Sequence, residues 1–536
     1  MKQPDQIDLS TEELEALLGR VRRVVAEEDY QKLAAVIRTL GYVTKLLENR
    51  EATLDTLRRL LCRSSTEKTK QVLQQAGMEA SKEKSKPSRD RAAKESAGHG
   101  RNSAAAYQGA TRVAVAHGSL KSGDPCPDSL CGGKVYPLRE PGVLVRIKGQ
   151  APVAATVYEL EKLRCNLCGK VFTAEAPQEA GEKKYDETAA GMIALLRYGS
   201  GFPWYRLQGL EASLGIPLPV ATQCEVVAEI AGDLRPALEE LIRQAAQGGV
   251  MHNDDTSMRV LSLGRNRARD AEVAPERTGV FTSGIVSISE GRRIALFFTG
   301  RKHAGENLAD VLKRRPAGLS PPIQMCDALS RNLPKSLKVI VAHCLAHGRR
   351  NFVEVIASFP AECRFVLETL GEVYGCEEQA RKRGLSPEER LHFHQKHSAP
   401  VMGKLHAWLH TQFEEKHVEP NSGLGKAISY LLRHWERLTL FLRQAGAPLD
   451  NNVVERGLKK AILHRKNSLF YKTRNGARMG DLFMSLIHTC ELNGANPLDY
   501  LTELQRHASE LKANPSEWMP WNYRETLLRH TAPAAA

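Results

Sequence analysis

Three carboxylates in the sequence occupy positions from which they could share one metal site. Asp254 lies in the first of several predicted strands, Asp327 lies at the end of the fourth, and Glu455 lies near the start of a later predicted helix. Magnesium binds carboxylate oxygens, and two such ions about 4 Å apart can activate a nucleophile and stabilise the leaving oxygen in phosphoryl transfer. The layout is therefore compatible with a two-metal site that needs no histidine base.

Each of these acids also has a purely structural explanation. Asn452 could be a helix N-cap with Glu455 completing its capping box, and an aspartate at the end of a strand commonly begins a turn. Asp255 adds an ambiguity, because neighbouring residues of a strand point to opposite faces and only one of Asp254 and Asp255 can face a shared site. Residue type and order alone leave these alternatives open.

A run of cations follows Glu455 along its predicted helix. Lys459 lies one helical turn beyond the acid, and His464 lies about three turns along. Such cations could hold DNA phosphates on either side of a scissile bond, and the alternative is a basic face that is merely solvated. The predicted phosphate-binding residues are Arg456, Lys459, Lys460, His464, Arg465 and Lys466, together with Arg349 and Arg350 from an earlier segment.

Two short-spaced cysteine pairs predict a structural zinc site. Zinc takes four ligands in a tetrahedron, and two close pairs that are each followed by a glycine can supply that geometry. The pairs are Cys126 with Cys131 and Cys165 with Cys168. The spacing of the first pair is less usual than that of the second, and a redox pair or ordinary buried cysteines are the alternatives.

A second group of potential ligands consists of His343, Cys344 and His347. No fourth ligand follows nearby in the sequence, so we expect a buried structural cluster rather than a metal site. The chain has 11 cysteines, an odd number scattered along its length, which favours a reducing compartment over a disulfide framework.

Composition limits the class of protein. The 536 residues are too many for one hydrophobic core, so about three or four domains are expected. The excess of 76 Lys and Arg over 62 Asp and Glu gives a net charge of +14, which favours a polyanionic partner such as nucleic acid. The sequence shows no signal-peptide pattern and no run of about 20 apolar residues, so we expect an unexported, cytoplasmic protein without a membrane partner.

An N-terminal helical region is predicted to self-associate. Ser10 and Glu13 form a capping-box pattern at its start. Over residues 33–61, apolar residues follow alternating three- and four-residue steps, which is typical of a coiled coil of about four heptads. The alternative is an intramolecular helical hairpin, because Gly41 lies inside the pattern. The apolar positions are Leu33, Val36, Leu40, Val43, Leu47, Leu54, Leu57 and Leu61.

A mixed sheet flanked by helices is predicted in the middle of the chain. Strands are expected within residues 250–263, 278–288, 292–300, 321–329 and 337–345, with an amphipathic helix at 306–315 between the third and the fourth. Residues 349–444 are predicted to be helical, and Ser386, Pro387 and Glu389 should open one of those helices. The fold class is therefore multidomain α+β.

Several strings in the chain resemble the IS-sixty-six-type DDE transposases of bacterial insertion sequences. "NNVVERGLKKAILHRKNSLF" is similar to that family's Asn-Asn, Glu-Arg and Arg-Lys-Asn-x-Leu-Phe signature, and "AHCLAHGRRNFVEV" is similar to its Cys-x-x-His-x-Arg-Arg-x-Phe element. Further matches are "SSTEKT", "GHGR", "NGANPLDYL" and "WMPWNY". The resemblance extends over nearly the whole chain.

The resemblance implies a metal-dependent transposase. It implies an RNase H-like catalytic core that is interrupted by a helical insertion and that uses two Mg²⁺ or Mn²⁺ ions to cleave and rejoin DNA. Carried over residue by residue, it makes Asp254, Asp327 and Glu455 the catalytic and metal-binding triad. Its implied partners are the terminal inverted repeats of the element, target DNA, a second copy of the chain in a homo-oligomer such as a dimer, and small accessory proteins of the same element. The implied location is the bacterial nucleoid.

Two departures from the family pattern define the alternatives. The family usually has Glu where this chain has Asp255, and Gly and Tyr where it has Ala328 and Leu329. The second departure lies directly beside Asp327 and raises the alternative of a zinc-containing DNA-binding protein, derived from a transposase, that has lost catalysis. A plain nuclease, which cleaves DNA without rejoining it, is the third hypothesis.

These predictions divide the chain into eight segments. The first four are a coiled-coil oligomerisation or DNA-binding region at 1–75, a basic flexible linker at 76–123, a zinc ribbon-like module at 124–185, and a helical region at 186–248. The pattern around Gly215 and Pro217 in this helical region fits either a helical hairpin or a helix-turn-helix. The others are the two parts of the catalytic core at 249–355 and 445–495, a helical insertion at 356–444 between them, and a C-terminal tail at 496–536.

Overall fold

The computed structural model describes residues 113–128, 151–164, 170–265, 277–335 and 337–531 continuously, with isolated residues between and before these ranges. All the elements named below belong to the unit Lys82–Ala536. The predicted coiled coil at 33–61, the capping box at Ser10 and most of the basic linker lie outside the described residues. None of the helices in the described ranges is long and apolar enough to cross a membrane.

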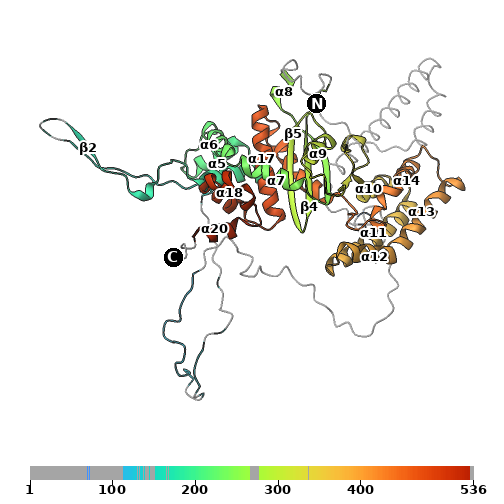
Figure 1. Ribbon diagram of the computed structural model, residues 1–536, viewed down its shortest axis with the longest axis horizontal. Helices are drawn as coiled ribbons and strands as arrows, with labels where there is room; N and C mark the ends of the chain where they lie inside the picture. Colours follow the sequence, from blue (N-terminus) through green and yellow to red (C-terminus); the bar gives the residue numbers. More distant parts are fainter. Residues whose placement is uncertain are drawn as a thin grey trace, which may run out of the picture. The chain divides into compact units, whose positions relative to one another are not determined.

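A five-stranded mixed sheet organises the described part of the chain (Figure 1). Its strand order is β5-β4-β3-β6-β7, in which β3, β4 and β5 form an antiparallel meander and β6 and β7 run parallel to β3. The strands are β3 (Val250–Ser257), β4 (Phe281–Ser289), β5 (Arg292–Gly300), β6 (Ile323–Cys326) and β7 (Ile340–His343). All five predicted strands and the mixed α/β class are thus confirmed.

Helices cover both faces of this sheet. α7 (Arg235–Ala245) and α9 (Ala304–Leu312) pack on one face, and α16 (Asn452–Ser468) packs on β3 and β4 from the other. α17 (Arg474–Leu492) runs along β5. The predicted helix at 306–315 corresponds to α9 and ends earlier, at Leu312, before three consecutive basic residues.

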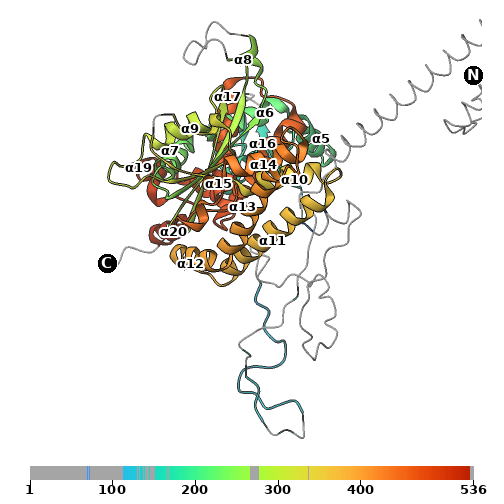
Figure 2. The ribbon, with the colours of Figure 1, turned by 90° about the vertical axis from the view of Figure 1, so that its right-hand side faces the viewer.

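The long helical stretch between β7 and α16 forms a group of helices beside the sheet (Figure 2). Ser386 and Glu389 make the predicted capping box at the start of one of them, with both reciprocal hydrogen bonds present. The helices are α10 (Leu345–Val355), α11 (Pro360–Lys382), α12 (Pro387–His397), α13 (Ala399–Glu414), α14 (Gly423–Arg433) and α15 (Trp435–Leu438).

The segments before and after the sheet region are also helical. The predicted interruption at Gly215 is present, and this residue has a φ of +79° between α5 and α6. A small antiparallel hairpin of β1 (Lys162–Arg164) and β2 (Val171–Thr173) precedes them. The helices are α4 (Glu187–Ala194), α5 (Trp204–Ser213), α6 (Val220–Asp233), α18 (Pro497–Arg506), α19 (Ala508–Ala513) and α20 (Tyr523–Thr531), with a π-helical turn at Leu195–Gly199 after α4.

Side chains of α17 hydrogen-bond the edge strand β5. Alternate residues of β5 donate their backbone N–H groups to side chains that recur every four residues along α17, at distances of 2.7 to 3.1 Å. Two strand residues span about 6.8 Å and four helix residues about 6 Å, so the two repeats stay in step over this length. The pairs are Arg293 with Asn493, Ala295 with Thr489, Phe297 with Ser485, and Thr299 with Asp481. The helix thereby satisfies an edge that would otherwise be open to pairing with another chain.

This capping predicts the effect of Thr489→Val. The Thr489 hydroxyl accepts from Ala295 N at 3.0 Å in a buried position, so the isosteric valine leaves that N–H group without a partner. We expect the free energy of unfolding to fall by about 1–3 kcal/mol, measured by urea denaturation. Thr411→Val is the matched control, because the Thr411 hydroxyl donates to Ala407 O of its own helix. Equal losses in the two variants would contradict the capping role.

Candidate active site

Asp254 lies in β3, on the face of the sheet that α16 covers. Its Oδ1 accepts from the backbone N–H of Asp255 at 2.8 Å. Burial raises the pKa of the Asp254 carboxyl to about 7, and the charges of Asp327 and Glu455 act in the same direction. His252 pairs with Met325 in the parallel register of β3 and β6, so Asp327 lies beside Asp254, and α16 packs against Gly284, which pairs with Asp254. The structure therefore brings the three sequence-predicted acids into one neighbourhood.

Asp255 points to the opposite face of β3. Its Oδ2 lies 3.0 Å from Nδ1 of His303 at the start of α9, and its Oδ1 accepts from Ser283 Oγ at 2.7 Å. Only 1% of its side chain is exposed. The alternation of a strand thus separates the two neighbouring aspartates, and Asp254 is the one on the side of Asp327 and Glu455.

Asp327 directly follows β6, in a turn that is tied to the centre of the sheet. Its Oδ1 accepts from Leu329 N and from the side-chain amide of Asn332. The backbone carbonyl of Asn332 in turn accepts from Asn253 Nδ2 at 2.8 Å and from Gln324 Nε2 at 2.6 Å. The turn role that the sequence suggested for Asp327 is therefore real, and the same turn holds the acid near Asp254.

Glu455 lies in the first turns of α16 and takes no part in a capping box. The N-cap residue is Asn451, one position earlier than the sequence suggested, and its side chain makes no capping hydrogen bond. Glu455 is consequently the fourth residue of the helix rather than the third, where a capping-box glutamate belongs. Asn452 instead bonds Asp450 through both its backbone and its side-chain amide. The capping explanation for Glu455 is wrong.

Asn451 connects three separate parts of the chain. Its Nδ2 donates to the backbone carbonyl of Asn253 at 3.1 Å, and its Oδ1 lies 3.1 Å from Nδ1 of His252, so its side chain binds β3 instead of its own helix. Its backbone N–H donates to Cys344 Sγ at 3.2 Å, at the end of β7. The residue is fully buried. Asn451 thereby fixes the start of α16, and with it Glu455, against the strand that carries Asp254.

Gly284 allows α16 to lie close to the sheet at this point. It pairs with Asp254 across β3 and β4. A Cβ atom at this position would come within 3.0 Å of Leu458 and 3.1 Å of Val454, both of which are buried on α16. Any larger residue here would push away the helix that carries Glu455.

α10 places two further side chains against the Glu455 carboxylate. His347 Nδ1 lies 3.7 Å from Glu455 Oε1, and Arg350 Nη2 lies 3.9 Å from Oε2. Both His347 Nδ1 and Glu455 Oε1 are buried atoms without a hydrogen-bond partner. The sequence suggested neither contact, because α10 and α16 are separated by the whole helical insertion. The only available signal was the i, i+3 spacing of His347 and Arg350, which puts them on one helix face.

The cluster expected from His343, Cys344 and His347 is divided by the structure. His343 packs edge-on against His434, with ring centroids 5.1 Å apart. Cys344 and His347 instead share a side with Glu455, and one ligand atom from each of the three lies within 4.8 Å of the others. Burial raises the pKa of the Cys344 thiol to about 12, and its Sγ already accepts from Asn451 N. A protonated thiol in that position serves as a hydrogen-bond acceptor for Asn451.

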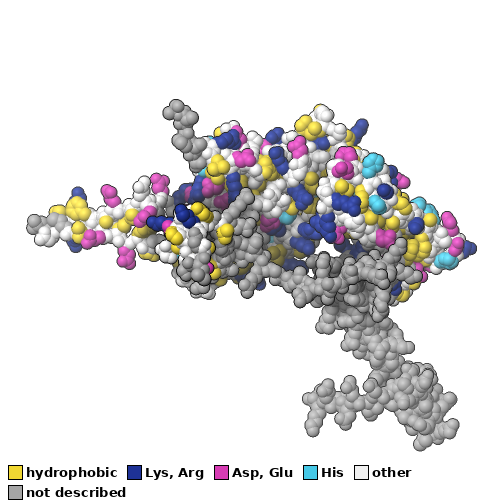
Figure 3. Space-filling view, turned by 90° about the horizontal axis from the view of Figure 1, so that it is seen from below, with side chains coloured by type: hydrophobic (Ala, Val, Ile, Leu, Met, Phe, Trp, Pro, Cys, Tyr) yellow, Lys and Arg dark blue, Asp and Glu magenta, His cyan; other side chains and the backbone are white. Residues whose placement is uncertain are grey.

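Four of the predicted phosphate-binding cations are accessible. Arg456, Lys459 and Lys466 are exposed on α16. Arg350 on α10 keeps 38% of its side chain exposed while it lies beside Glu455. Figure 3 shows one face of the molecule, on which Lys and Arg side chains gather near the middle among acidic and apolar ones.

The other predicted cations contact the protein itself. Lys460 Nζ lies 2.8 Å from Glu491 Oε1, and the Arg465 guanidinium donates to the Ser257 hydroxyl at 2.6 Å. Arg349 is only 7% exposed. These three residues therefore have structural contacts that the sequence pattern did not indicate.

His464 is not a cation in this structure. Its ring is buried and stacks on Tyr471 with centroids 4.1 Å apart, and its Nε2 lies 2.8 Å from Nη2 of Arg197. Burial, with the charge of Arg197, lowers the pKa of His464 to about 3. The prediction that His464 contacts phosphate is wrong, because an uncharged ring inside the core reaches no DNA.

Part of the predicted zinc module is described. Cys126 and Cys131 lie in a tight turn, in which Cys126 N donates to Gly133 O at 2.8 Å. Cys168 is exposed in the loop between β1 and β2. Cys165 lies outside the described residues, so the tetrahedral arrangement of the four sulfurs stays a prediction.

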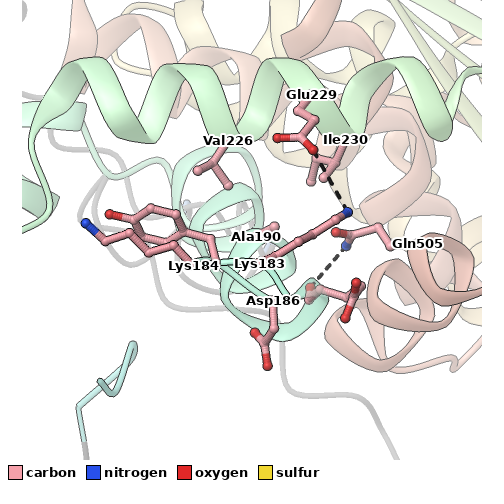
Figure 4. Close-up of a pocket in the computed structure, with 10 residues that line it drawn as sticks. Lys183, Lys184, Asp186, Ala190, Val226, Glu229, Ile230 and Gln505 are labelled. Carbon is pink, nitrogen blue, oxygen red and sulfur yellow. Dashed lines mark hydrogen bonds and ion pairs between the residues drawn. The ribbon is translucent and has the colours of Figure 1, made fainter. Parts of the chain in front are cut away.

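A surface pocket lies apart from the carboxylates, between α4, α6 and α18 (Figure 4). Lys183 and Glu229 face each other across it, with Nζ and Oε1 3.9 Å apart, and Gln505 donates to the Glu187 carbonyl at 3.1 Å. The pocket shares no residue with the site at β3, β6 and α16. Its charges are mixed and its ion pair is exposed, so it does not define a binding site.

Comparison with known proteins places the chain in a family of DNA-mobilising proteins. The model of the family described as "Transposase IS66 family" matches residues 184–479, which is more than half of the chain and includes Asp254, Asp327 and Glu455. The chain belongs to the IS66 transposase family, and the resemblance noted in the sequence is confirmed. Membership implies DNA as a partner.

Curated relatives come from Sinorhizobium fredii, and all three are named as uncharacterized. Protein y4jD is 30% identical over 379 residues, which cover 67% of this chain and 71% of the relative. Protein y4qI is 27% identical over 351 residues, covering 63% and 62%, and y4hP is 25% identical over 385 residues, covering 68% and 67%. The chain thus spans somewhat less than two thirds of y4qI. These names assign no activity to the relatives.

The two adjacent asparagines provide a test of the site's framework. Asn451→Ala leaves the carbonyl of Asn253 and the His252 ring without their buried partner, so we expect a loss of about 2–3 kcal/mol in the free energy of unfolding. Asn452→Ala removes only a local bond to Asp450 and should cost about 0.5 kcal/mol. Chemical denaturation of both variants measures the difference. A smaller loss for Asn451→Ala than for Asn452→Ala would contradict the connecting role of Asn451.

Proposed function

We propose that this chain is a DNA transposase that cleaves DNA at the ends of its insertion sequence and joins those ends to target DNA, with Asp254, Asp327 and Glu455 as the catalytic triad. One observation carries the proposal. Three acids share one face of the sheet. They come from a central strand, from the end of a neighbouring parallel strand and from a helix more than 100 residues later. The chain that carries them belongs to the IS66 transposase family.

The sheet topology supports an RNase H-like core. An antiparallel meander of three strands is followed by a helix and by two strands parallel to the first, with the first strand in the centre. The acids then lie on the central strand, after the fourth strand and on a later helix. In this proposal the helices α11 to α15 are the insertion that separates the first part of the core from the glutamate.

The residues present suit divalent cations. The candidate ligands are carboxylate oxygens, which magnesium and manganese prefer. Glu455 Oε1 is a buried oxygen without a hydrogen-bond partner. Burial, together with the charges of Asp327 and Glu455, raises the pKa of Asp254, and a bound cation would favour its ionised form. Two Mg²⁺ or Mn²⁺ ions bound there would activate the nucleophile and stabilise the leaving oxygen in DNA strand cleavage and transfer.

The chain's own residues would arrange the acids and the DNA. Asn451 fixes the start of α16 on β3, and the Asn332 turn fixes Asp327. His347 and Arg350 flank the Glu455 carboxylate and restrict its orientation. The exposed cations of α16, which are Arg456, Lys459 and Lys466, would then hold phosphates of a duplex lying along that helix.

The alternative of a catalytically inactive DNA-binding protein rests on Ala328 and Leu329. Leu329 has φ −79° and ψ 128°, an ordinary extended conformation, and Ala328 is not among the described residues with positive φ. Asp327 Oδ1 accepts from the Asn332 side chain and from the backbone N–H of Leu329, and any non-proline residue at position 329 supplies the second bond. The departure from the family's Gly and Tyr therefore leaves the turn intact, which favours an active enzyme.

Substitution of the acids tests the triad. Glu455→Gln, Asp254→Asn and Asp327→Asn each remove a metal ligand, so strand cleavage should fall below roughly 1% of wild type while DNA binding at fixed salt persists. The substrate is a plasmid carrying the inverted repeats that flank the coding sequence, with Mg²⁺ or Mn²⁺, and gel analysis scores cleaved and joined products. Cleavage without joined products would instead indicate a plain nuclease.

Asp255→Asn is the matched control, because Asp255 lies on the other face of the same strand. Its folding should be verified by circular dichroism, since the Asp255 carboxylate bonds His303 and Ser283. A folded Asp255→Asn variant should keep most of its cleavage activity. Full activity in Glu455→Gln, or loss in Asp255→Asn with Asp254→Asn still active, would place the site on other carboxylates.

Other parts of the proposal concern assembly. We propose that Cys126, Cys131, Cys165 and Cys168 hold one structural zinc ion in a ribbon-like module, and that residues 33–61 form a coiled coil between subunits of a homo-oligomer such as a dimer.

The helices α5 and α6 would contact DNA if they act as a helix-turn-helix. We further propose nucleoid-associated DNA in the cytoplasm as the site of action, with small accessory proteins of the same element as partners.

Metal analysis tests the zinc module. Four thiolates should bind about one zinc ion per chain, which elemental analysis of protein purified without chelator detects. Replacing both Cys165 and Cys168 by Ser should remove that zinc. Replacing Cys326 and Cys490, which are buried in and beside the sheet, is the matched control and should leave the zinc content unchanged. Zinc content that is the same in the Cys165 and Cys168 variant as in wild type would refute the assignment.

A further inference from the structure

The end of α16 has a strained backbone at an apolar residue. The helix ends at Ser468, and Leu469 has φ +66° and ψ −41°, which is a conformation that L-residues rarely adopt. The Phe470 N–H group donates to the Ser468 carbonyl at 2.8 Å, so the three residues form a γ-turn of the rare type with positive φ. Glycine would adopt this backbone without strain, yet the sequence has leucine.

The residues on both sides of this turn are fixed to the protein. Before it, Asn467 Nδ2 donates to the Gly201 carbonyl at 3.0 Å, and Arg197 donates to the Ser468 hydroxyl at 2.6 Å. After it, Tyr471 N donates to the Arg259 carbonyl at 2.9 Å, in an extension of β3. The turn is therefore held in one conformation by bonds to two different elements.

Leu469 and Phe470, here called the Leu469–Phe470 turn, point away from the core. Leu469 is 64% exposed and Phe470 is 37% exposed, whereas the next residue, Tyr471, is 4% exposed. Strained backbone and exposed apolar area both cost stability, and most of the Leu469 side chain is not covered by the described residues. Rigid presentation of two apolar side chains to a partner would explain both features.

The charge around the turn identifies the partner. Residues 465–480 contain five Lys or Arg and no Asp or Glu. Lys466 immediately before the turn and Lys472 shortly after it are both exposed. A polyanion suits this segment, and among polyanions a DNA duplex also offers apolar base faces between which such side chains can insert.

We propose that the Leu469–Phe470 turn is a wedge that inserts between adjacent bases of the DNA duplex bound along α16 and unstacks that base step. This inference rests on the proposed function and adds to it a defined distortion of the substrate. Fourteen residues of helix separate Glu455 from Leu469, which is about 21 Å, so the unstacked step should lie about six base pairs from the cleaved phosphate.

Fluorescence of 2-aminopurine tests the wedge, because this base brightens when it loses its stacking neighbours. The full chain is mixed with duplexes of the inverted repeat that flanks the coding sequence, each carrying 2-aminopurine at one position, in buffer without divalent cation so that the DNA stays intact. Wild-type protein should raise the fluorescence about threefold or more at one base step. Leu469→Gly and Phe470→Ala should abolish this rise and weaken binding by roughly tenfold.

Two comparisons separate the wedge from a structural role. Leu469→Gly relieves the positive φ, so its melting temperature should equal or exceed that of wild type even though the fluorescence rise is lost. Leu528→Ala removes a leucine that is 71% exposed on α20 and should behave as wild type in both measurements.

The remaining outcomes distinguish failure of the wedge from failure of the proposed triad. An unchanged fluorescence rise in Leu469→Gly and Phe470→Ala excludes the wedge, and a reduced oligomer mass in those variants would assign the turn to contact between copies of the chain. Wild-type protein that binds and cleaves the duplex without any fluorescence rise refutes the wedge alone. Wild-type protein that unstacks the step while Glu455→Gln still cleaves normally supports the wedge and refutes the proposed triad.

Discussion

The site depends on one constraint, which is the binding of the buried Asn451 side chain to β3. About 200 residues separate Asn451 from the strand that it contacts, and the helical insertion from α11 to α15 lies between α10 and α16. Without a specific polar contact, the position of α16 along the sheet would rest on apolar packing alone. The amide of Asn451 fixes that position through Asn253 and His252, and Gly284 lets the helix approach closely. Glu455 is placed by these contacts and by no local feature of its own helix.

The edge of the sheet is stabilised by an analogous device. Hydroxyl, amide and carboxyl groups at four-residue intervals along α17 bind the free N–H groups of β5. The strand therefore ends the sheet without offering an edge to other chains. Together, Asn451 and the polar side of α17 show that the two helices after the insertion are held on the sheet by side-chain to backbone hydrogen bonds in addition to their apolar faces.

The electrostatics of the site follow from this arrangement. Burial, together with the charges of Asp327 and Glu455, raises the pKa of Asp254, and Arg350 Nη2 lies 3.9 Å from Glu455 Oε2. Neighbouring carboxylates repel one another, and a bound cation would relieve that repulsion. Carboxylate oxygens are the ligands that divalent cations such as magnesium prefer, and α16 also carries the exposed cations Arg456, Lys459 and Lys466.

The sequence by itself determined the elements and the family. The five strands, the helix α9, the capping box at Ser386 and the three acids could be read from periodicity, cap residues and strings, because these signals are local. Tertiary structure decided which side chains meet. It places Asp254, and not Asp255, on the side of Glu455, and it puts His347 beside Glu455. It also makes Asn451 the N-cap of α16 and leaves His464 buried and uncharged. Those outcomes depend on strand pairing and on how α16 lies on the sheet after a long insertion, and no local pattern of residues encodes contacts between segments so far apart in the chain.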